Sequence, residues 1–196
     1  MDEITDAAHL CIDMQNIFAK GGVWETPWME KVLPVISDLA ARYKERTIFT
    51  RFITPREPEE RPGQWRAYFR KWERATRAHL SPGDLDLVPA LARYVPPAMV
   101  VDKPAYSAFT GSRLAGLLAE KHVGTIIVTG AETDVCVLST VLSAVDLGFR
   151  VIIVEDGLCS SSDTGHDALM TMYRTRFHGQ IDLVGAAELQ ELWRPL

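Results

Sequence analysis

Apolar positions along the chain fall into two alternating patterns. Short apolar runs occupy residues 8–12, 47–50, 98–101, 125–128, 151–154 and, more weakly, 181–184. Longer stretches between them carry apolar residues at helical spacing, near 29–44, 84–93, 111–121, 134–147 and 164–176. Short strands that alternate with helices predict a parallel α/β sheet. The fourth and fifth runs are apolar on successive residues, which is typical of strands covered on both faces.

Residues with capping preferences stand at the borders of these predicted helices. Gly148 is expected to end the helix at 134–147, because glycine readily adopts the left-handed conformation found at that position. Thr133 is expected to cap the start of the same helix, and Ser162 or Asp163 the start of the helix at 164–176.

Residues 54–83 interrupt the alternation and are predicted to be an insertion in one domain that spans residues 1–196. The segment is rich in proline and carries aromatic residues at the spacing of one helix face, namely Trp65, Tyr68, Phe69 and Trp72. In one interpretation this face packs on the core or on a second subunit. In the other it forms a lid or a pocket wall.

Composition and charge restrict the class of protein. The chain has 196 residues, 47% of them hydrophobic and 24% charged, as in a globular domain. Its net charge of −5 argues against a protein built to bind nucleic acid. Residues 42–77 nevertheless hold 11 Lys and Arg against 5 Asp and Glu. This local excess is either a solvated face or subunit contact, or a field that steers an anionic substrate.

Sequence signals for location and for cysteine chemistry are weak. No apolar run approaches the roughly 18 residues of a membrane helix, and the acidic start MDEITD is unlike a signal peptide. Three widely spaced cysteines, Cys11, Cys136 and Cys159, favour neither a disulfide framework nor a zinc site. We therefore expect a cytoplasmic protein with no membrane partner.

Candidate chemistry follows three of the predicted strands. In an open parallel sheet, ligands bind beyond the carboxyl ends of the strands. Asp13 follows the first run, Lys103 the third and Cys136 the fourth. An acid, a base and a thiol are therefore predicted to lie at the same edge of the sheet.

Each of these residues has an ordinary structural interpretation beside the functional one. Asp13 either bonds nearby amides as a turn residue or is a general base that takes the Cys136 proton. Lys103 is either a surface lysine or holds Asp13 ionised and stabilises a thiolate. Cys136 is either a small buried hydrophobe, as Cys11 is expected to be, or a nucleophile whose thiolate the start of a helix favours.

Three motifs carry a resemblance to a known family. They are Asp13-Met14-Gln15 with Phe18, Lys103 through Ser107-Ala108-Phe109, and Gly130 through Thr133-Asp134-Val135-Cys136-Val137. In this order and spacing they resemble the isochorismatase-like cysteine hydrolases, the superfamily of nicotinamidase and N-carbamoylsarcosine amidase. The resemblance extends from Leu10 to about Val184.

The resemblance implies both a fold and a catalytic apparatus. The implied fold has three layers, α/β/α, around a six-stranded parallel sheet in the order 3-2-1-4-5-6. Asp13, Lys103 and Cys136 would form a catalytic triad, and a cis peptide would join Ala131 to Glu132. The backbone amides of Glu132 and Cys136 would form an oxyanion hole. Family habit also suggests a homodimer or homotetramer.

The chain departs from its apparent relatives at two sites. Nicotinamidases place an Asp and two His as metal ligands after the second strand, whereas residues 50–58 contain no histidine. No metal and no other cofactor is therefore expected. Glu132 stands where many members have a small residue. Its carboxylate either points into the pocket, which would suit a cationic or donor-rich substrate, or faces away and makes a structural hydrogen bond.

Residues beside the three motifs are candidates for the substrate pocket. Phe18, Trp24, Tyr106 and Thr133 are expected to line it, and core packing is the competing interpretation for the aromatic residues. His166 is expected to be a capping or packing residue rather than a catalytic one.

The sequence thus predicts a metal-independent amidohydrolase that cleaves a C–N bond of a small carboxamide, ureido or carbamoyl compound through a thioester. Two alternatives keep the fold. One is an isochorismatase-type hydrolase of a non-amide bond, and the other is a non-catalytic protein that binds a small molecule. Siderophore-pathway isochorismatases lack the nucleophilic cysteine, so Cys136 favours amide over vinyl-ether hydrolysis.

Overall fold

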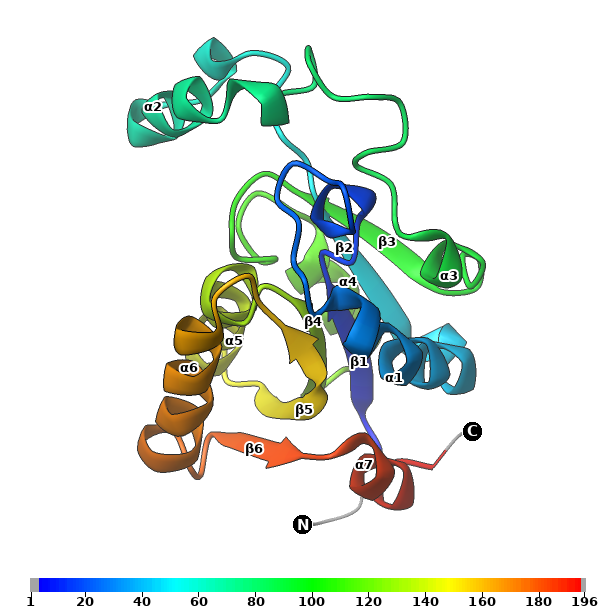
Figure 1. Ribbon diagram of the computed structural model, residues 1–196. Helices are drawn as coiled ribbons and strands as arrows, with labels where there is room; N and C mark the ends of the chain where they lie inside the picture. The colour runs from blue at the N-terminus through cyan, green and yellow to red at the C-terminus, as the bar shows by residue number, and fades with distance from the viewer. Residues whose placement is uncertain (1–3, 195–196) are drawn as a thin grey trace.

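A computed structural model describes residues 4–194 as a parallel sheet flanked by helices (Figure 1). The six strands lie in the order β3-β2-β1-β4-β5-β6, and every pair is parallel, which confirms the predicted fold class. Their bounds are β1 (Ala7–Ile12), β2 (Thr47–Phe52), β3 (Met99–Lys103), β4 (Thr125–Ala131), β5 (Arg150–Cys159) and β6 (Ile181–Val184).

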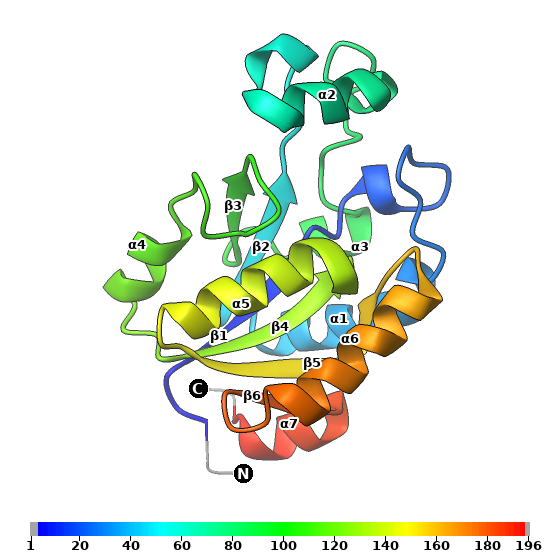
Figure 2. The same ribbon diagram turned by 90° about the vertical axis from the view of Figure 1, so that its left-hand side faces the viewer.

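Helices cover both faces of this sheet, with α5 and α6 in front of it and α1 behind it in Figure 2. One face is covered by α4 (Leu114–Glu120), α5 (Leu138–Asp146) and α6 (Asp163–Arg176). The other is covered by α1 (Met29–Arg42), α3 (Pro89–Ala92) and α7 (Ala186–Leu192). Every residue of β1 and β4 is buried, because these central strands have apolar layers on both sides. Within residues 4–194, none of the helices is long and apolar enough to cross a bilayer.

The helix predicted at 84–93 is wrong over most of its length, since only α3 (Pro89–Ala92) is helical. Residues 84–88 instead bond to the loop that follows β1. The Asn16 N–H, for example, donates to the carbonyl of Asp86 at 2.9 Å. Backbone groups committed to a neighbouring loop are not free to form a helical turn.

Two other predicted helices have different bounds. The helix predicted at 111–121 begins at Leu114. The helix predicted at 134–147 is divided into a π-helical turn, η5 (Thr133–Val137), and α5. Thr133 does not cap this turn, because its hydroxyl bonds instead to the Cys159 carbonyl and the His166 ring.

The other two predicted helix ends are confirmed. Gly148 follows the end of α5 with a φ of 85°, in the left-handed region that glycine tolerates. Ser162, rather than Asp163, caps α6, and its hydroxyl accepts the Gly165 N–H at 3.0 Å.

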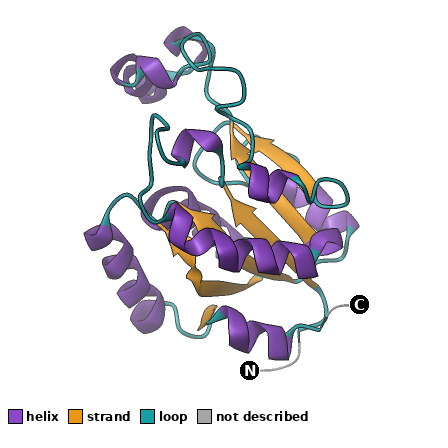
Figure 3. Cartoon of the chain, turned by 45° about the vertical axis from the view of Figure 1, so that its right-hand side comes forward, coloured by secondary structure: helices purple, strands orange, loops and turns teal. Residues whose placement is uncertain are grey.

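The proline-rich segment lies beyond the carboxyl end of β2 (Figure 3). It contains α2 (Gly63–Lys71), whose aromatic face packs inward, with Phe69 fully buried and its ring centre 6.5 Å from that of Phe52. Short turns complete the chain, namely η1 (Asn16–Phe18), η2 (Lys44–Arg46), η3 (Pro58–Glu60) and η4 (Glu73–Ala75). The assignment of residues 1–196 to one domain stays a prediction.

A close approach of β1 and β4 sets the geometry at the edge of the sheet where the candidate chemistry lies. Gly130 pairs with Ile12 and has a φ of 114°. A Cβ atom on Gly130 would lie 2.1 Å from the Ile12 carbonyl oxygen, so any side chain would push the two strands apart. Because Asp13 follows Ile12, Gly130 fixes the position of Asp13 relative to the turn after β4.

Gly130→Ala is expected to destabilise the protein by about 2 kcal/mol or more, because it adds both a backbone clash and left-handed strain. Gly116→Ala in α4 is the matched control, since a Cβ there meets no atom within 4 Å. The control is expected to stabilise the fold by roughly 0.5–1 kcal/mol. Urea unfolding of the three proteins measures both changes. Equal stability of Gly130→Ala and the wild type would show that the strands are farther apart than described.

Candidate active site

Three side chains from separate strand exits meet beyond the carboxyl edge of the sheet. Asp13 directly follows β1, Lys103 is the last residue of β3, and Cys136 lies in the η5 turn after β4. Since β2 separates β1 from β3, Lys103 reaches Asp13 across Phe52, with Nζ 5.0 Å from the centre of that ring. The structure thus brings together the three residues singled out from the strand exits.

The Asp13 carboxylate is buried and held from two sides. Its Oδ2 lies 2.7 Å from Lys103 Nζ, and neither side chain has any exposed surface. Its Oδ1 accepts a 2.6 Å hydrogen bond from the Thr50 hydroxyl, which itself accepts the Asp13 backbone N–H at 3.1 Å. Asp13 also has a φ of 49°, a left-handed conformation that is uncommon outside glycine and recurs at functional sites.

The Lys103 ammonium is fixed by the loop that follows it. It donates hydrogen bonds of 2.9 Å to the carbonyls of Ala105 and Tyr106, which leaves one of its three protons for Asp13 or Cys136. Burial lowers the pKa of Lys103, but the charges of Asp13 and Cys136 and hydrogen bonds to both raise it above its ordinary value. Lys103 therefore remains charged beside its buried partner.

The Cys136 thiol is 5% exposed and borders a cavity. Burial and the charge of Asp13 raise its pKa far above the ordinary range for a thiol, and the opposing effect of Lys103 is smaller. The effects of Asp13 and Lys103 on this pKa show that both lie beside the thiol. The expectation that the start of a helix favours a thiolate here is wrong for the resting site, because burial and the neighbouring carboxylate outweigh it.

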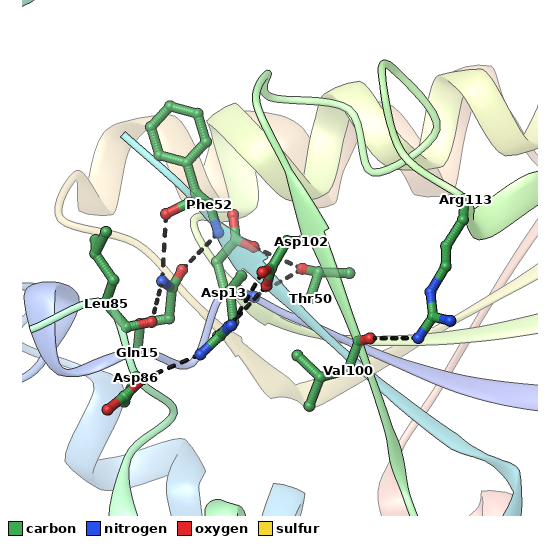
Figure 4. A network of polar contacts seen from close by, with 10 residues as sticks. Asp13, Gln15, Thr50, Phe52, Leu85, Asp86, Val100, Asp102 and Arg113 are labelled. Carbon is green, nitrogen blue, oxygen red and sulfur yellow. Dashed lines mark hydrogen bonds and ion pairs between the residues drawn. The ribbon is translucent and has the colours of Figure 1, made fainter. Parts of the chain in front are cut away.

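Polar contacts hold the surrounding loops in place (Figure 4). The Gln15 side chain donates to the carbonyls of Phe52 and Leu85 at 3.3 and 2.7 Å, and accepts the Phe52 N–H at 2.7 Å. It thereby joins the exit of β1 to the end of β2 and to residues 84–88. Beside it, Arg51 pairs with Asp86 at 3.0 Å and with Asp102 at 2.7 Å.

A cavity of about 520 Å³ lies beside Cys136, a volume that suits a small-molecule ligand. Its walls are mainly aromatic and consist of Phe18, Trp24, Phe52, Tyr68, Trp72 and Tyr106. The charged side chains that line it are Glu25, Arg74 and Glu132. A second cavity, of about 490 Å³, lies near the amino ends of the strands and contains none of the three grouped residues.

Three of the four predicted pocket residues line this cavity, and the fourth does not. Phe18, Trp24 and Tyr106 line the cavity. Thr133 does not, because its hydroxyl faces the Cys159 carbonyl at 3.2 Å and His166 Nδ1 at 2.8 Å. His166 also packs on Trp28, with ring centres 5.5 Å apart, which agrees with the expectation of a packing role.

Sequence reasoning did not assign Phe52, Tyr68, Trp72 or Arg74 to the pocket by name. Tyr68 and Trp72 belong to the aromatic face at 65–72, so the pocket-wall interpretation of that face holds for these two. Phe52 lies two residues beyond the predicted strand at 47–50 and is the last residue of β2. Its position at a strand exit was the signal that could have identified it as a pocket residue.

The Ala131–Glu132 peptide bond, which the resemblance implies to be cis, is cis in the structure. The Glu132 side chain lines the cavity and also accepts the Ser161 N–H at 3.0 Å through Oε1. The side chain therefore does not face away from the cavity, although it does make the structural hydrogen bond.

Residues at the position of the nicotinamidase metal site do not fit a metal ion. At the end of β2, Arg51 is engaged with Asp86 and Asp102, and Phe52 presents an apolar ring to the cavity, while residues 53–58 contain no histidine. Among residues 4–194, no three His, Cys, Asp or Glu side chains are grouped as a metal site requires.

Comparison with known proteins supplies the family. The sequence profile of the Isochorismatase domain matches residues 7–183. The chain belongs to the isochorismatase family. This confirms the resemblance carried by the three motifs.

Several members of the isochorismatase family are similar to this chain. Nicotinamidase 3 of Arabidopsis thaliana is 28% identical over 165 residues, which cover 84% of this chain and 78% of that protein. N-carbamoylsarcosine amidase of Arthrobacter sp is 30% identical over 152 residues, 74% of this chain and 56% of that protein. For two isochorismatase family proteins of Bacillus subtilis, the match spans only 47% and 44% of their length.

A solved structure shares the fold along nearly the whole chain. The cysteine hydrolase from Pseudomonas syringae pv. phaseolicola 1448A superimposes with a TM-score of 0.82 at 22% identity, and the match covers 96% of this chain and 93% of that one. The isochorismatase family is hydrolytic, and the relatives named above include an amidase.

Asp13→Asn is expected to accelerate alkylation of Cys136 by iodoacetamide at pH 7 several-fold. The substitution removes a charge that raises the pKa of the thiol, and a thiolate at Cys136 would then replace the carboxylate as the partner of Lys103. Mass spectrometry of the Cys136 peptide, followed over time and pH, measures this rate.

Cys11 and Cys159 serve as internal controls for this experiment. Both are fully buried, and burial raises the pKa of Cys11 to about 12. Their alkylation would report unfolding of the variant. If Cys136 reacts more slowly in a folded Asp13→Asn protein, Asp13 does not oppose thiolate formation.

Proposed function

We propose that this chain is a thiol-dependent amidohydrolase that cleaves a C–N bond of a small carboxamide, ureido or carbamoyl compound through a thioester on Cys136. One observation carries the proposal. A buried thiol borders an aromatic cavity and is in contact with a fully buried Asp13–Lys103 ion pair. A proton acceptor, a fixed cation and a nucleophile are thus within reach of one bound carbonyl.

In the first step, Asp13 accepts the thiol proton while the Cys136 sulfur attacks the carbonyl carbon. A C–S bond forms, and the carbonyl oxygen becomes an oxyanion that the backbone amides of Glu132 and Cys136 stabilise. Within residues 4–194 the Glu132 N–H has no other hydrogen-bond acceptor, so it is free for this role. Because the resting thiol has a raised pKa, proton transfer to Asp13 accompanies the attack rather than preceding it.

In the second step, the tetrahedral intermediate breaks its C–N bond, and the leaving nitrogen takes the proton from Asp13. Ammonia or an amine departs and a thioester remains. Water then gives a proton to Asp13 and attacks the thioester carbonyl. Cleavage of the C–S bond releases the acid, and the sulfur recovers its proton from Asp13.

Lys103 acts as a fixed positive charge throughout this cycle. Its bonds to the Ala105 and Tyr106 carbonyls hold it in place while Asp13 gains and loses a proton. The ammonium offsets the negative charge shared by Asp13 and Cys136, so the transient thiolate is less costly to form.

The names of two relatives, nicotinamidase and N-carbamoylsarcosine amidase, support an amide substrate. The proposal includes no metal, since the residues after β2 do not offer a ligand set. A cytoplasmic location is a further part of the proposal and rests on the three widely spaced cysteines. A homodimer or homotetramer is another part and rests on the resemblance.

Cys136→Ala is expected to abolish ammonia release from a panel of carboxamide, ureido and carbamoyl compounds while leaving the unfolding temperature nearly unchanged. The reason is that the variant loses the only sulfur of residues 4–194 that borders the cavity. Cys11→Ala and Cys159→Ala are the controls, because both remove buried thiols that lie outside the cavity lining, and both should retain turnover. Full activity of Cys136→Ala would refute the mechanism.

A further inference from the structure

We propose that the cavity is built for a substrate whose acyl part carries a cationic nitrogen, an alkylated or protonated ammonium, held between the Glu132 carboxylate and the faces of the aromatic rings. This inference rests on the proposed function for the reaction at Cys136. It adds the substrate class from the lining of the same cavity.

The aromatic walls form one connected cluster around Trp24. The centre of its ring lies 5.8 Å from Phe18, 6.0 Å from Phe52, 6.3 Å from Tyr68 and 6.1 Å from Trp72. Ring faces attract cations within about 6 Å of their centres, and clusters of several rings are the usual binding sites for quaternary ammonium groups. Rings alone would also accept a neutral apolar ligand, so the charged residues of the lining decide between the two.

Glu132 supplies a negative charge to the cavity that Cys136 borders. Only its Oε1 is engaged, by the Ser161 N–H, and no residue within 4–194 donates a hydrogen bond to Oε2. Glu132 lines the same cavity as Tyr68 and Tyr106, and its charge contributes to the raised pKa of both. A cation held by Oε2 inside this cavity would therefore have aromatic walls around it.

The remaining charges of the lining do not offset this carboxylate. Glu25 adds a second negative charge, and Arg74 is the one lining residue among the 11 cations of residues 42–77. Arg74 is exposed, and its guanidinium carbon lies 5.9 Å from the centre of the Trp72 ring. The steering of an anionic substrate by this basic segment is therefore not favoured.

Other cations of that segment are occupied outside the cavity. Arg51 pairs with Asp86 and Asp102, and Arg70 pairs with Glu59 at 3.0 Å. Arg61 donates to the Ile53 carbonyl, and Arg77 to the Thr54 carbonyl.

The shared cavity limits how the cation is attached to the scissile group. Glu132 is four residues before Cys136 at the turn that follows β4, and both line the same cavity. A small substrate that reaches both residues carries its cationic nitrogen near the carbonyl that the sulfur attacks. An α-ammonio amide, with one carbon between nitrogen and carbonyl, has this geometry.

Three amides of similar size test the inference. They are trimethylammonioacetamide, its uncharged isostere 3,3-dimethylbutanamide, and the anion succinamate. Isothermal titration calorimetry on Cys136→Ala measures binding without turnover. We expect the cationic amide to bind about ten-fold more tightly than its isostere. Adding Glu132→Gln should remove most of this ratio, whereas Glu120→Gln, an exposed charge change on α4 outside the cavity, should preserve it.

Three results would overturn the inference. The first is equal or tighter binding of the isostere. The second is a preference for succinamate, which would assign recognition to Arg74. The third is no detectable binding of the cationic amide at a concentration on the order of 10 mM.

Ammonia release by the unmodified protein separates this inference from the proposed function. Cys136-dependent hydrolysis of the neutral amide without a preference for the cation would leave the function standing and remove the inference. Selective binding of the cation without Cys136-dependent hydrolysis of any amide would remove the function and leave the assignment of the ligand class.

Discussion

The ion pair between Asp13 and Lys103 is the interaction on which the rest of the site depends. Two charges with no exposed surface are stable only together, because loss of either partner leaves an uncompensated charge and costs roughly 3–5 kcal/mol. The neighbours of the pair supply the remaining polar contacts. The Thr50 hydroxyl donates to Oδ1 of Asp13, the oxygen that is not paired with Lys103. The carbonyls of Ala105 and Tyr106 accept hydrogen bonds from the Lys103 ammonium. The loop after β3 and the exit of β1 are therefore fixed by the same pair of charges.

Sheet topology explains why residues so far apart in sequence reach this pair. The chain leaves β1 for β2 and β3 on one side, then crosses to β4 on the other, so β1 and β4 are neighbours at the point where the strand order reverses. Open parallel sheets bind ligands at such a point. Gly130 allows the two strands to approach there, because its missing side chain leaves room for the backbone of Ile12. Asp13 and Cys136 approach from these two strands, and Lys103 spans the width of β2 to join them.

The parts of the structure that could be predicted from sequence are those with short-range signals. Apolar runs located all six strands, and the strand exits identified Asp13, Lys103 and Cys136. Three features could not be predicted from the sequence, because they depend on contacts between distant segments. Residues 84–88 look helical in sequence but are bound to the loop after β1. Thr133 has the side chain of a cap but is engaged by His166 from α6. The protonation state of Cys136 follows from its burial and from Asp13, which lies 123 positions away, rather than from its own turn.

A raised pKa at the nucleophile and an extra carboxylate in the cavity are connected under the proposed substrate class. The charge of Glu132 contributes to the raised pKa of Tyr68, Tyr106 and Cys159, whereas burial and the charge of Asp13 raise the pKa of Cys136. In the absence of a ligand, burial and Asp13 therefore disfavour the thiolate. A cation held by Glu132 would add a positive charge to the cavity that Cys136 borders and would oppose the effect of Asp13 on the thiol. Binding of the correct substrate would then lower the cost of forming the nucleophile, while neutral or anionic molecules of the same size would meet a protonated thiol.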